Sequence, residues 1–170
     1  RGPRAALLRA RQACAGGAVR LTSGSAGATL SDSLLVNNTA AYGGAVCVLN
    51  KDASLTATST DFVANTATQG GAVRLQGYEG LSGPLSEFYD CKFEANVASN
   101  KGSALMLKYG SANLTRCRVA DNGDSDLTIA ALFMQKGGWV HVTSTTFAGN
   151  YPRAVYVDDA SSVASSQLPG

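Results

Sequence analysis

Apolar and polar residues alternate in short stretches along the chain. In the stretch GGAVRL at residues 70–75, Val73 and Leu75 would face one side of an extended segment and Arg74 the other. A period of two predicts a β-strand at this place. The same apolar pair recurs at Val19/Leu21, Val46/Val48, Leu105/Leu107, Leu132/Met134 and Val155/Val157.

A second strand is predicted to end on the hydrophobic residue that opens a motif of the form FxxN. The positions five residues before that hydrophobic residue are nearly all apolar: Leu30, Ala57, Phe88, Leu114 and Val142. No apolar run in the chain approaches the roughly 18 residues that a membrane-spanning helix needs. We therefore expect no direct membrane insertion.

The two motifs repeat in phase with each other. GGAV occurs from residues 16, 43 and 70, and weaker copies begin at residues 102, 129 and 152, with spacings of 27, 27, 32, 27 and 23. The FxxN motif begins at residues 35, 62, 93, 119 and 147, so its asparagines lie 27, 31, 26 and 28 residues apart. Such phased repetition indicates a solenoid built from one repeated unit.

About 27 residues per copy are too few for two strands, a helix and their loops, but they suffice for two or three strands with turns. The sequence therefore predicts an all-β fold, a right-handed parallel β-helix (β-solenoid) of about five to six rungs with roughly 27 residues per rung. Rungs stacked about 4.8 Å apart would place the apolar columns in one continuous core.

The asparagine of FxxN would occupy the same turn in every rung. We expect Asn38, Asn65, Asn96, Asn122 and Asn150 to form a hydrogen-bonded Asn ladder that satisfies amides left unpaired by the turn. The alternative is that these asparagines are simply good turn residues.

We expect residues 1–13 to form a leader or N-terminal cap, residues 14–158 the parallel β-helix domain and residues 159–170 a flexible linker or tail. The four arginines of the first segment lie opposite Ala6, Leu7 and Ala10 on a helical wheel, which suits a short cap helix. A disordered leader is the alternative. The formal charge is +2, but residues 14–170 sum to 10 − 12 = −2, which disfavours nucleic acid as a partner.

The motifs GGAV, FVAN, FEAN and FAGN resemble the polymorphic outer membrane protein repeats of chlamydiae, which also occur in other bacterial and algal surface proteins. The resemblance covers roughly residues 16–157, although copies four and five keep only the FxxN half well. It implies a pectin-lyase-like β-helix that serves as a passenger or stalk region of an adhesin, with no catalytic residues to carry over.

Cys91 and Cys117 stand two residues before the motif hydrophobe, at equivalent points of adjacent rungs. Neighbouring parallel strands hold Cα atoms about 4.8 Å apart, so a disulfide is geometrically allowed. Two stacked reduced thiols are the alternative. The pairing of Cys14 and Cys47 is open, and four cysteines without CxxC spacing argue against zinc.

Three further groups of residues are candidate sites. Asn37 and Asn113 open glycosylation sequons, which favours an oxidising, extracellular compartment. Asp121, Asp124 and Asp126 could hold Ca²⁺, although such a run is more often a solvated turn, and we expect no other cofactor. Met106, Phe133 and Tyr156 are adjacent outward positions, a candidate interaction strip unless a loop covers them.

The enzymatic alternative depends on the best constellation of titratable side chains in the sequence, Glu87 and Asp90 with Arg116 on the next rung and His141 one rung further. Outward threonines on the same sheet suggested an ice-like water array as another alternative. We expect a non-enzymatic scaffold at the cell surface or outside the cell, for adhesion or filament assembly. Its partners would be other protein chains, copies of itself end to end, or glycans.

Overall fold

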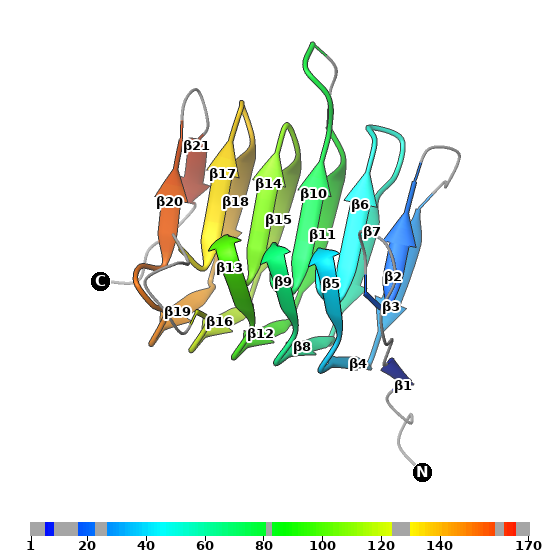
Figure 1. Cartoon of the computed structure of the whole chain (residues 1–170), viewed down its shortest axis with the longest axis vertical. Coiled ribbons are helices and arrows are strands. Elements are labelled where there is room, and N and C mark those ends of the chain that lie inside the picture. The colour runs from blue at the N-terminus through cyan, green and yellow to red at the C-terminus, as the bar shows by residue number, and fades with distance from the viewer. Residues whose placement is uncertain are drawn as a thin grey trace.

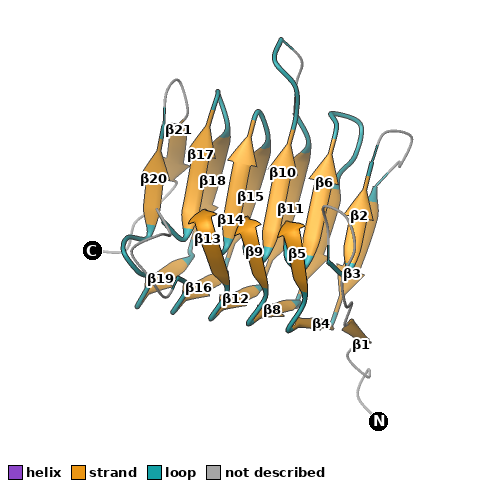
Figure 2. Ribbon diagram, in the orientation of Figure 1, coloured by secondary structure: helices purple, strands orange, loops and turns teal. Residues whose placement is uncertain are grey.

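The computed structural model describes residues 6–8, 17–22, 27–80, 83–123, 130–158 and 162–165. The regular structure in these segments is β-strand throughout, and no helix occurs among them (Figure 2). The strands wind into a parallel β-solenoid of about five turns with about 27 residues per turn, which confirms the predicted fold class. Within the described part of the chain, no helix could span a membrane.

Three six-stranded parallel sheets run along the solenoid, and a fourth sheet of three strands lies beside sheet 2 (Figure 1). Sheet 1 contains, in spatial order, β1 (Ala6–Leu8), β4 (Ser33–Val36), β8 (Asp61–Val63), β12 (Lys92–Glu94), β16 (Arg118–Ala120) and β19 (Thr146–Ala148). Sheet 2 contains β2 (Val19–Leu21), β6 (Val46–Leu49), β10 (Val73–Gln76), β14 (Leu105–Lys108), β17 (Leu132–Gln135) and β20 (Val155–Val157). Sheet 3 contains β3 (Ala28–Ser31), β7 (Leu55–Thr58), β11 (Leu85–Tyr89), β15 (Ser111–Thr115), β18 (Trp139–Thr143) and β21 (Ser162–Ser165). The small sheet contains β5 (Thr39–Tyr42), β9 (Thr66–Gln69) and β13 (Val97–Lys101).

The register between rungs follows the repeat. Val73 on β10 lies between Val46 and Leu105, and each of these residues is fully buried. The GGAV motif thus leads into sheet 2, and the hydrophobic residue of FxxN lies in sheet 1. Because like residues meet in adjacent rungs, the inward columns form one continuous core.

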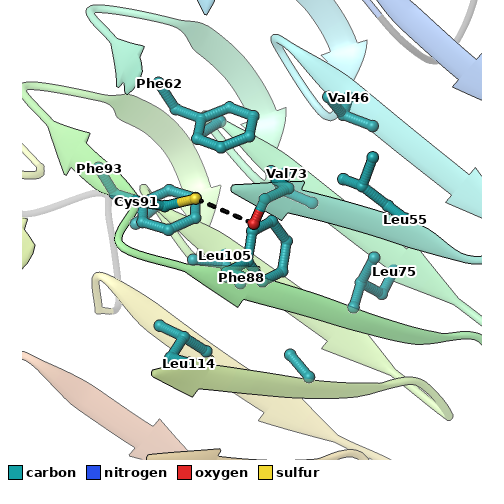
Figure 3. Close-up of a cluster of buried hydrophobic side chains, with 14 of the residues drawn as sticks. Val46, Leu55, Phe62, Val73, Leu75, Phe88, Cys91, Phe93, Leu105 and Leu114 are labelled. Atoms are coloured by element: carbon teal, nitrogen blue, oxygen red, sulfur yellow. Dashed lines mark hydrogen bonds between the residues drawn. The ribbon is translucent and has the colours of Figure 1, made fainter. Parts of the chain in front are cut away.

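Aromatic residues fill the centre of this core (Figure 3). Phe62 and Phe93 lie in adjacent rungs of sheet 1 and stack with ring centroids 4.8 Å apart and an interplanar angle of 4°. Phe88 of sheet 3 meets both rings edge-on, at 6.0 and 5.3 Å. All three side chains are fully buried, and each burial contributes about 1.5–3 kcal/mol.

Glycine is required where the small sheet turns into sheet 2. Gly70 has φ +67°, and a Cβ at this position would lie 2.5 Å from the Val73 carbonyl oxygen. At Gly71 a Cβ would lie 2.1 Å from the carbonyl oxygen of Ser103 in the next rung. The paired glycines of the motif therefore provide one left-handed residue and one close approach between rungs.

Sheet 3 connects to sheet 1 through a single residue in the left-handed conformation. This corner residue has φ between +46° and +54° in all five of the connections and is never glycine: Asp32, Ser59, Asp90, Arg116 and Ser144. This conformation is slightly strained for a residue that has a Cβ. The corner is thus set by stacking on its neighbours rather than by the local sequence.

The small sheet was not predicted, and it changes the surface of the protein. It joins FxxN to GGAV, and it aligns Ala40, Ala67 and Ala98 in one column. Its last column lies against the outward side of sheet 2, where the Tyr42 ring is 3.9 Å from Cζ of Arg74.

Two described strands lie outside residues 14–158, the range expected for the β-helix domain. Ala6–Leu8, expected within a leader or a cap helix, is strand β1 and pairs with β4. Ser162–Ser165, expected within a flexible tail, is strand β21 and pairs with β18. The backbone hydrogen bonds offered by a neighbouring strand outweigh the low complexity of these segments.

Candidate functional site

The five FxxN asparagines lie in one column and are hydrogen-bonded to one another. The backbone N–H and side-chain Nδ2 of Asn65 both donate to Oδ1 of Asn96, at 2.9 and 3.0 Å. The same pair of bonds links Asn38 to Asn65, Asn96 to Asn122 and Asn122 to Asn150. Each inner asparagine also donates from Nδ2 to the carbonyl of the motif hydrophobe one rung earlier, as Asn96 does to Phe62 at 2.9 Å.

Four members of this ladder are fully buried, and only Asn150 is half-buried. A buried amide that uses both its donors and its acceptor has no capacity left for a ligand. The column therefore stabilises the turn and does not bind a substrate.

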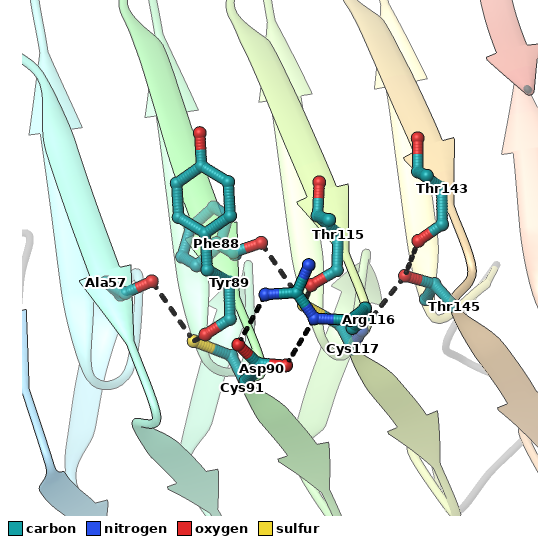
Figure 4. Close-up of polar contacts among 10 residues, drawn as sticks. All are labelled: Ala57, Phe88, Tyr89, Asp90, Cys91, Thr115, Arg116, Cys117, Thr143 and Thr145. Atoms are coloured by element: carbon teal, nitrogen blue, oxygen red, sulfur yellow. Dashed lines mark hydrogen bonds and ion pairs between the residues drawn. The ribbon is translucent and has the colours of Figure 1, made fainter.

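Cys91 and Cys117 are free thiols in the structure, so the predicted disulfide is not formed and the alternative of stacked thiols applies. Each Sγ lies within hydrogen-bonding distance of a carbonyl of the preceding rung, as Figure 4 shows for Cys91. Cys91 Sγ lies 3.4 Å from the Ala57 oxygen, and Cys117 Sγ lies 3.3 Å from the Phe88 oxygen.

The thiols reproduce the hydrogen bond that hydroxyls make elsewhere in the same column. Ser33, Thr60 and Thr145 donate to the carbonyl two residues earlier, at 2.7, 3.0 and 3.1 Å. Both cysteines make this contact as well, at 3.3 and 3.5 Å. The column is therefore a structural row of small donors.

Two of the buried thiols, Cys47 and Cys91, are poor nucleophiles. Burial raises the pKa of Cys47 to about 11, although Arg74 and Arg20 partly offset this increase. The contact with Cys117, together with burial, raises the pKa of Cys91. Because the thiolate is the reactive form, neither residue is suited to covalent catalysis at neutral pH. Cys14 lies outside the described residues.

The predicted interaction strip is wrong as an exposed surface. Met106, Phe133 and Tyr156 are adjacent in the register of sheet 2, as expected. However, Met106 is fully buried and Phe133 is 1% exposed. Lys101 of β13 lies over the Phe133 ring at 4.7 Å, and Tyr156 stacks on the other side at 5.1 Å. The alternative to an exposed strip was a segment that covers it, and the residue found over Phe133 belongs to strand β13.

The residues of the enzymatic alternative are only partly brought together. Arg116 donates from Nε and Nη2 to the two oxygens of Asp90, at 2.8 and 2.7 Å, and this hydrogen bonding lowers the pKa of Asp90 (Figure 4). Glu87 lies two rungs from His141 in the same outward column, with Asn113 between them. The Asp90 carboxylate is occupied by its own arginine, which leaves Glu87 as the acid nearest to the histidine along this column.

Two of the three predicted calcium ligands, Asp124 and Asp126, lie outside the described residues, and Asp121 is exposed. In the described segments, no group of three potential ligands is arranged to hold a metal ion. Asn37 is an exposed corner residue with φ +53°, and Asn113 is half-buried on β15. Both sequons thus lie at the surface.

No protein-family model, curated protein or solved structure matches this chain. The structure of this chain shows the parallel β-solenoid. The likeness to the polymorphic outer membrane protein repeats is limited to the sequence motifs.

Proposed function

We propose that this chain is a non-enzymatic scaffold module of an extracellular or cell-surface protein, used for adhesion or for structural and filament assembly. The observation that carries this proposal is the Asn ladder, an unbroken row of buried hydrogen bonds that joins five successive rungs. Such a row stiffens the solenoid along its axis, which suits a spacer or stalk. Similarity to chlamydial-type repeats supports the same function.

The compartment is proposed from the two sequons, both of which lie at the surface. Other protein chains, including copies joined end to end, are the proposed partners. The half-buried Asn150 and the partly exposed Phe147 of the last described rungs would suit contact with a further rung.

The test is surface labelling of intact cells of the native source, followed by electron microscopy of the purified protein. An antibody against the β10–β11 connection, the longest projection in Figure 1, should label intact cells as strongly as permeabilised ones. Images should show rods or filaments. Labelling that appears only after permeabilisation would overturn the proposal.

The enzymatic alternative has a separate test. Turnover of an acidic polysaccharide by the purified chain, lost on Glu87→Gln and retained on the matched change Glu94→Gln, would replace the scaffold proposal. Glu94 is a suitable control because it is half-buried on sheet 1 and forms an ion pair with Lys92.

A further inference from the structure

The outward side of sheet 3 carries a patch that differs from its surroundings. On the first two rungs of this sheet the outward residues are hydroxyls: Thr29, Ser31, Thr56 and Thr58. Three rungs interrupt this pattern with larger side chains. We name as the sheet 3 patch the nine residues Leu85, Glu87, Tyr89, Ser111, Asn113, Thr115, Trp139, His141 and Thr143, which are in register on β11, β15 and β18.

Two aromatic rings lie at opposite corners of the sheet 3 patch. Trp139 and Tyr89 are separated by two rungs and four residues along the strand direction. With about 4.8 Å per rung and about 3.3 Å per residue, their Cα atoms are about 16 Å apart. Asn113 lies midway on the diagonal that joins them. The arrangement is a line of ring, amide and ring across a flat sheet.

Both rings are accessible and do not pack on other rings. Trp139 is 38% exposed, and Tyr89 is half-buried. Among the described residues, neither ring stacks on another ring or makes a cation–π contact. Partial burial, together with a side-chain hydrogen bond to Glu87, raises the pKa of Tyr89. Figure 4 shows its ring on the same side of the sheet as Thr115 and Thr143.

The charge and the size of the sheet 3 patch restrict the ligand. The patch contains one carboxylate, one histidine and no lysine or arginine, so it offers nothing to a polyanion or an anionic membrane. Between Cα positions it covers roughly 10 by 13 Å, several times smaller than the about 800 Å² that each partner of a stable protein interface buries. An uncharged ligand with apolar faces and many hydroxyls fits both limits.

We propose that the sheet 3 patch binds a neutral oligosaccharide that lies along the diagonal from Trp139 to Tyr89. The apolar faces of its sugar rings would stack on the two aromatic rings, and its hydroxyls would bond to Asn113 and Glu87, which supply donors and acceptors. The inference extends the proposed adhesive function by naming the ligand class. It rests on that function only in assuming that the module meets ligands outside the cell.

The variants follow from the columns of sheet 3. Tyr89→Thr and Trp139→Ser replace each ring by the residue type that the same column has in an adjacent rung, Thr115 and Ser111, so the strand pattern is kept. Tyr78→Ser is the matched control, because Tyr78 is 49% exposed on the β10–β11 connection and lies outside the sheet 3 patch. Circular dichroism and the melting temperature would verify folding.

The full chain, produced in a host without N-glycosylation, would be tested on an array of neutral and acidic oligosaccharides. Trp139 is the only tryptophan, so titration of its fluorescence reports binding at the patch directly. We expect a neutral oligosaccharide to bind and to shift the emission. Tyr89→Thr should weaken binding about tenfold, Trp139→Ser should do the same on the array, and Tyr78→Ser should leave it unchanged.

Three outcomes would overturn the proposal: no neutral ligand bound by the parent chain, equal binding by all variants, or a preference for acidic ligands that disappears with salt. A glycan attached to Asn113 in the native protein would also overturn it, because that glycan would occupy the patch. None of these outcomes overturns the scaffold proposal, and a glycan on Asn113 would support its extracellular compartment; the scaffold proposal fails instead if intact cells are not labelled.

Discussion

Removing one amide from the middle of the Asn ladder is expected to destabilise the protein strongly. Asn96→Ala deletes four hydrogen bonds, two accepted from Asn65 and one donated to each of Phe62 and Asn122. At about 0.5–1.5 kcal/mol net for each bond the loss is about 2–6 kcal/mol. The fully buried N–H of Asn65 also loses its acceptor. We therefore expect a loss of about 3–5 kcal/mol.

The end of the ladder provides the control. Asn150→Ala deletes three bonds, but Asn150 is half-buried, so water can replace its amide. We expect a loss of about 1–2 kcal/mol there. Urea unfolding followed by far-UV circular dichroism measures both values. At a typical slope of about 2 kcal/mol per M, the midpoint of Asn96→Ala should fall by about 2 M and that of Asn150→Ala by less than about 1 M.

A third variant keeps the prediction testable if Asn96→Ala does not fold. Asn96→Asp retains the shape and the acceptor, but a carboxylate cannot donate to the carbonyl of Phe62 or to Asn122. Burial would raise the pKa of this carboxyl, so the variant should be most stable at acidic pH and lose stability as the pH rises. Equal effects of Asn96→Ala and Asn150→Ala, or a loss below about 1 kcal/mol at Asn96, would refute the stabilising role of the ladder.

Other changes test the turn, a thiol and a buried charge. Gly70→Ala should lower the free energy of unfolding by more than about 2 kcal/mol, because it adds a backbone clash to the strain of positive φ. Gly80 has φ +74° and no atom within 4 Å of an added Cβ, so Gly80→Ala should lower it by only about 1 kcal/mol. Urea unfolding compares the two variants. The pKa of Cys47, raised from 9.0 to about 11, stabilises the fold below about pH 9. About 2 kcal/mol of this stability should be lost as the pH rises to 11, and Cys47→Ala should lack this part of the pH dependence in the same assay. Arg74 is 7% exposed, and its Nε has no hydrogen-bond partner. The variant Arg74→Met copies Met106 of the next rung and should leave the melting temperature unchanged or raise it. A large decrease of the melting temperature would contradict this.

The repeat explains why so much of the fold could be predicted. Because the apolar pair of each GGAV copy has to meet the pair of the next, the spacing along the chain fixes the register in space. Val73 and Leu75 were placed correctly on this basis, as was Phe62 in its column. The fold class followed from periodicity without any knowledge of the turns.

The small sheet was missed because its strands show little alternation of apolar and polar residues. TATQ at β9 has one buried residue, Ala67, and alanine is a weak signal for a strand. The useful signal was the recurrence of alanine in one column, at Ala40, Ala67 and Ala98. Since Lys101 of this sheet lies over the Phe133 ring, missing the sheet also led to the wrong prediction of an exposed strip.

The thiols show the limit of reasoning from Cα spacing. Adjacent rungs bring Cys91 and Cys117 close enough for a bridge, yet both are free thiols in the structure. Both sulfurs follow the orientation of the hydroxyls in their column and point to carbonyl oxygens. The sheet 3 patch could likewise not be recognised in the sequence, because the register of three successive rungs is needed to place Trp139 and Tyr89 on the same surface.

The connection between β10 and β11 shows where this architecture tolerates added length. The asparagines of these two rungs are 31 residues apart rather than 27, yet Asn65 and Asn96 remain directly hydrogen-bonded. The extra residues leave the stack as the projection seen in Figure 1, and Gly80 there has open space around it. A foreign peptide grafted at this point should be displayed on a rigid support, and tandem copies of the rung would present it at a fixed pitch.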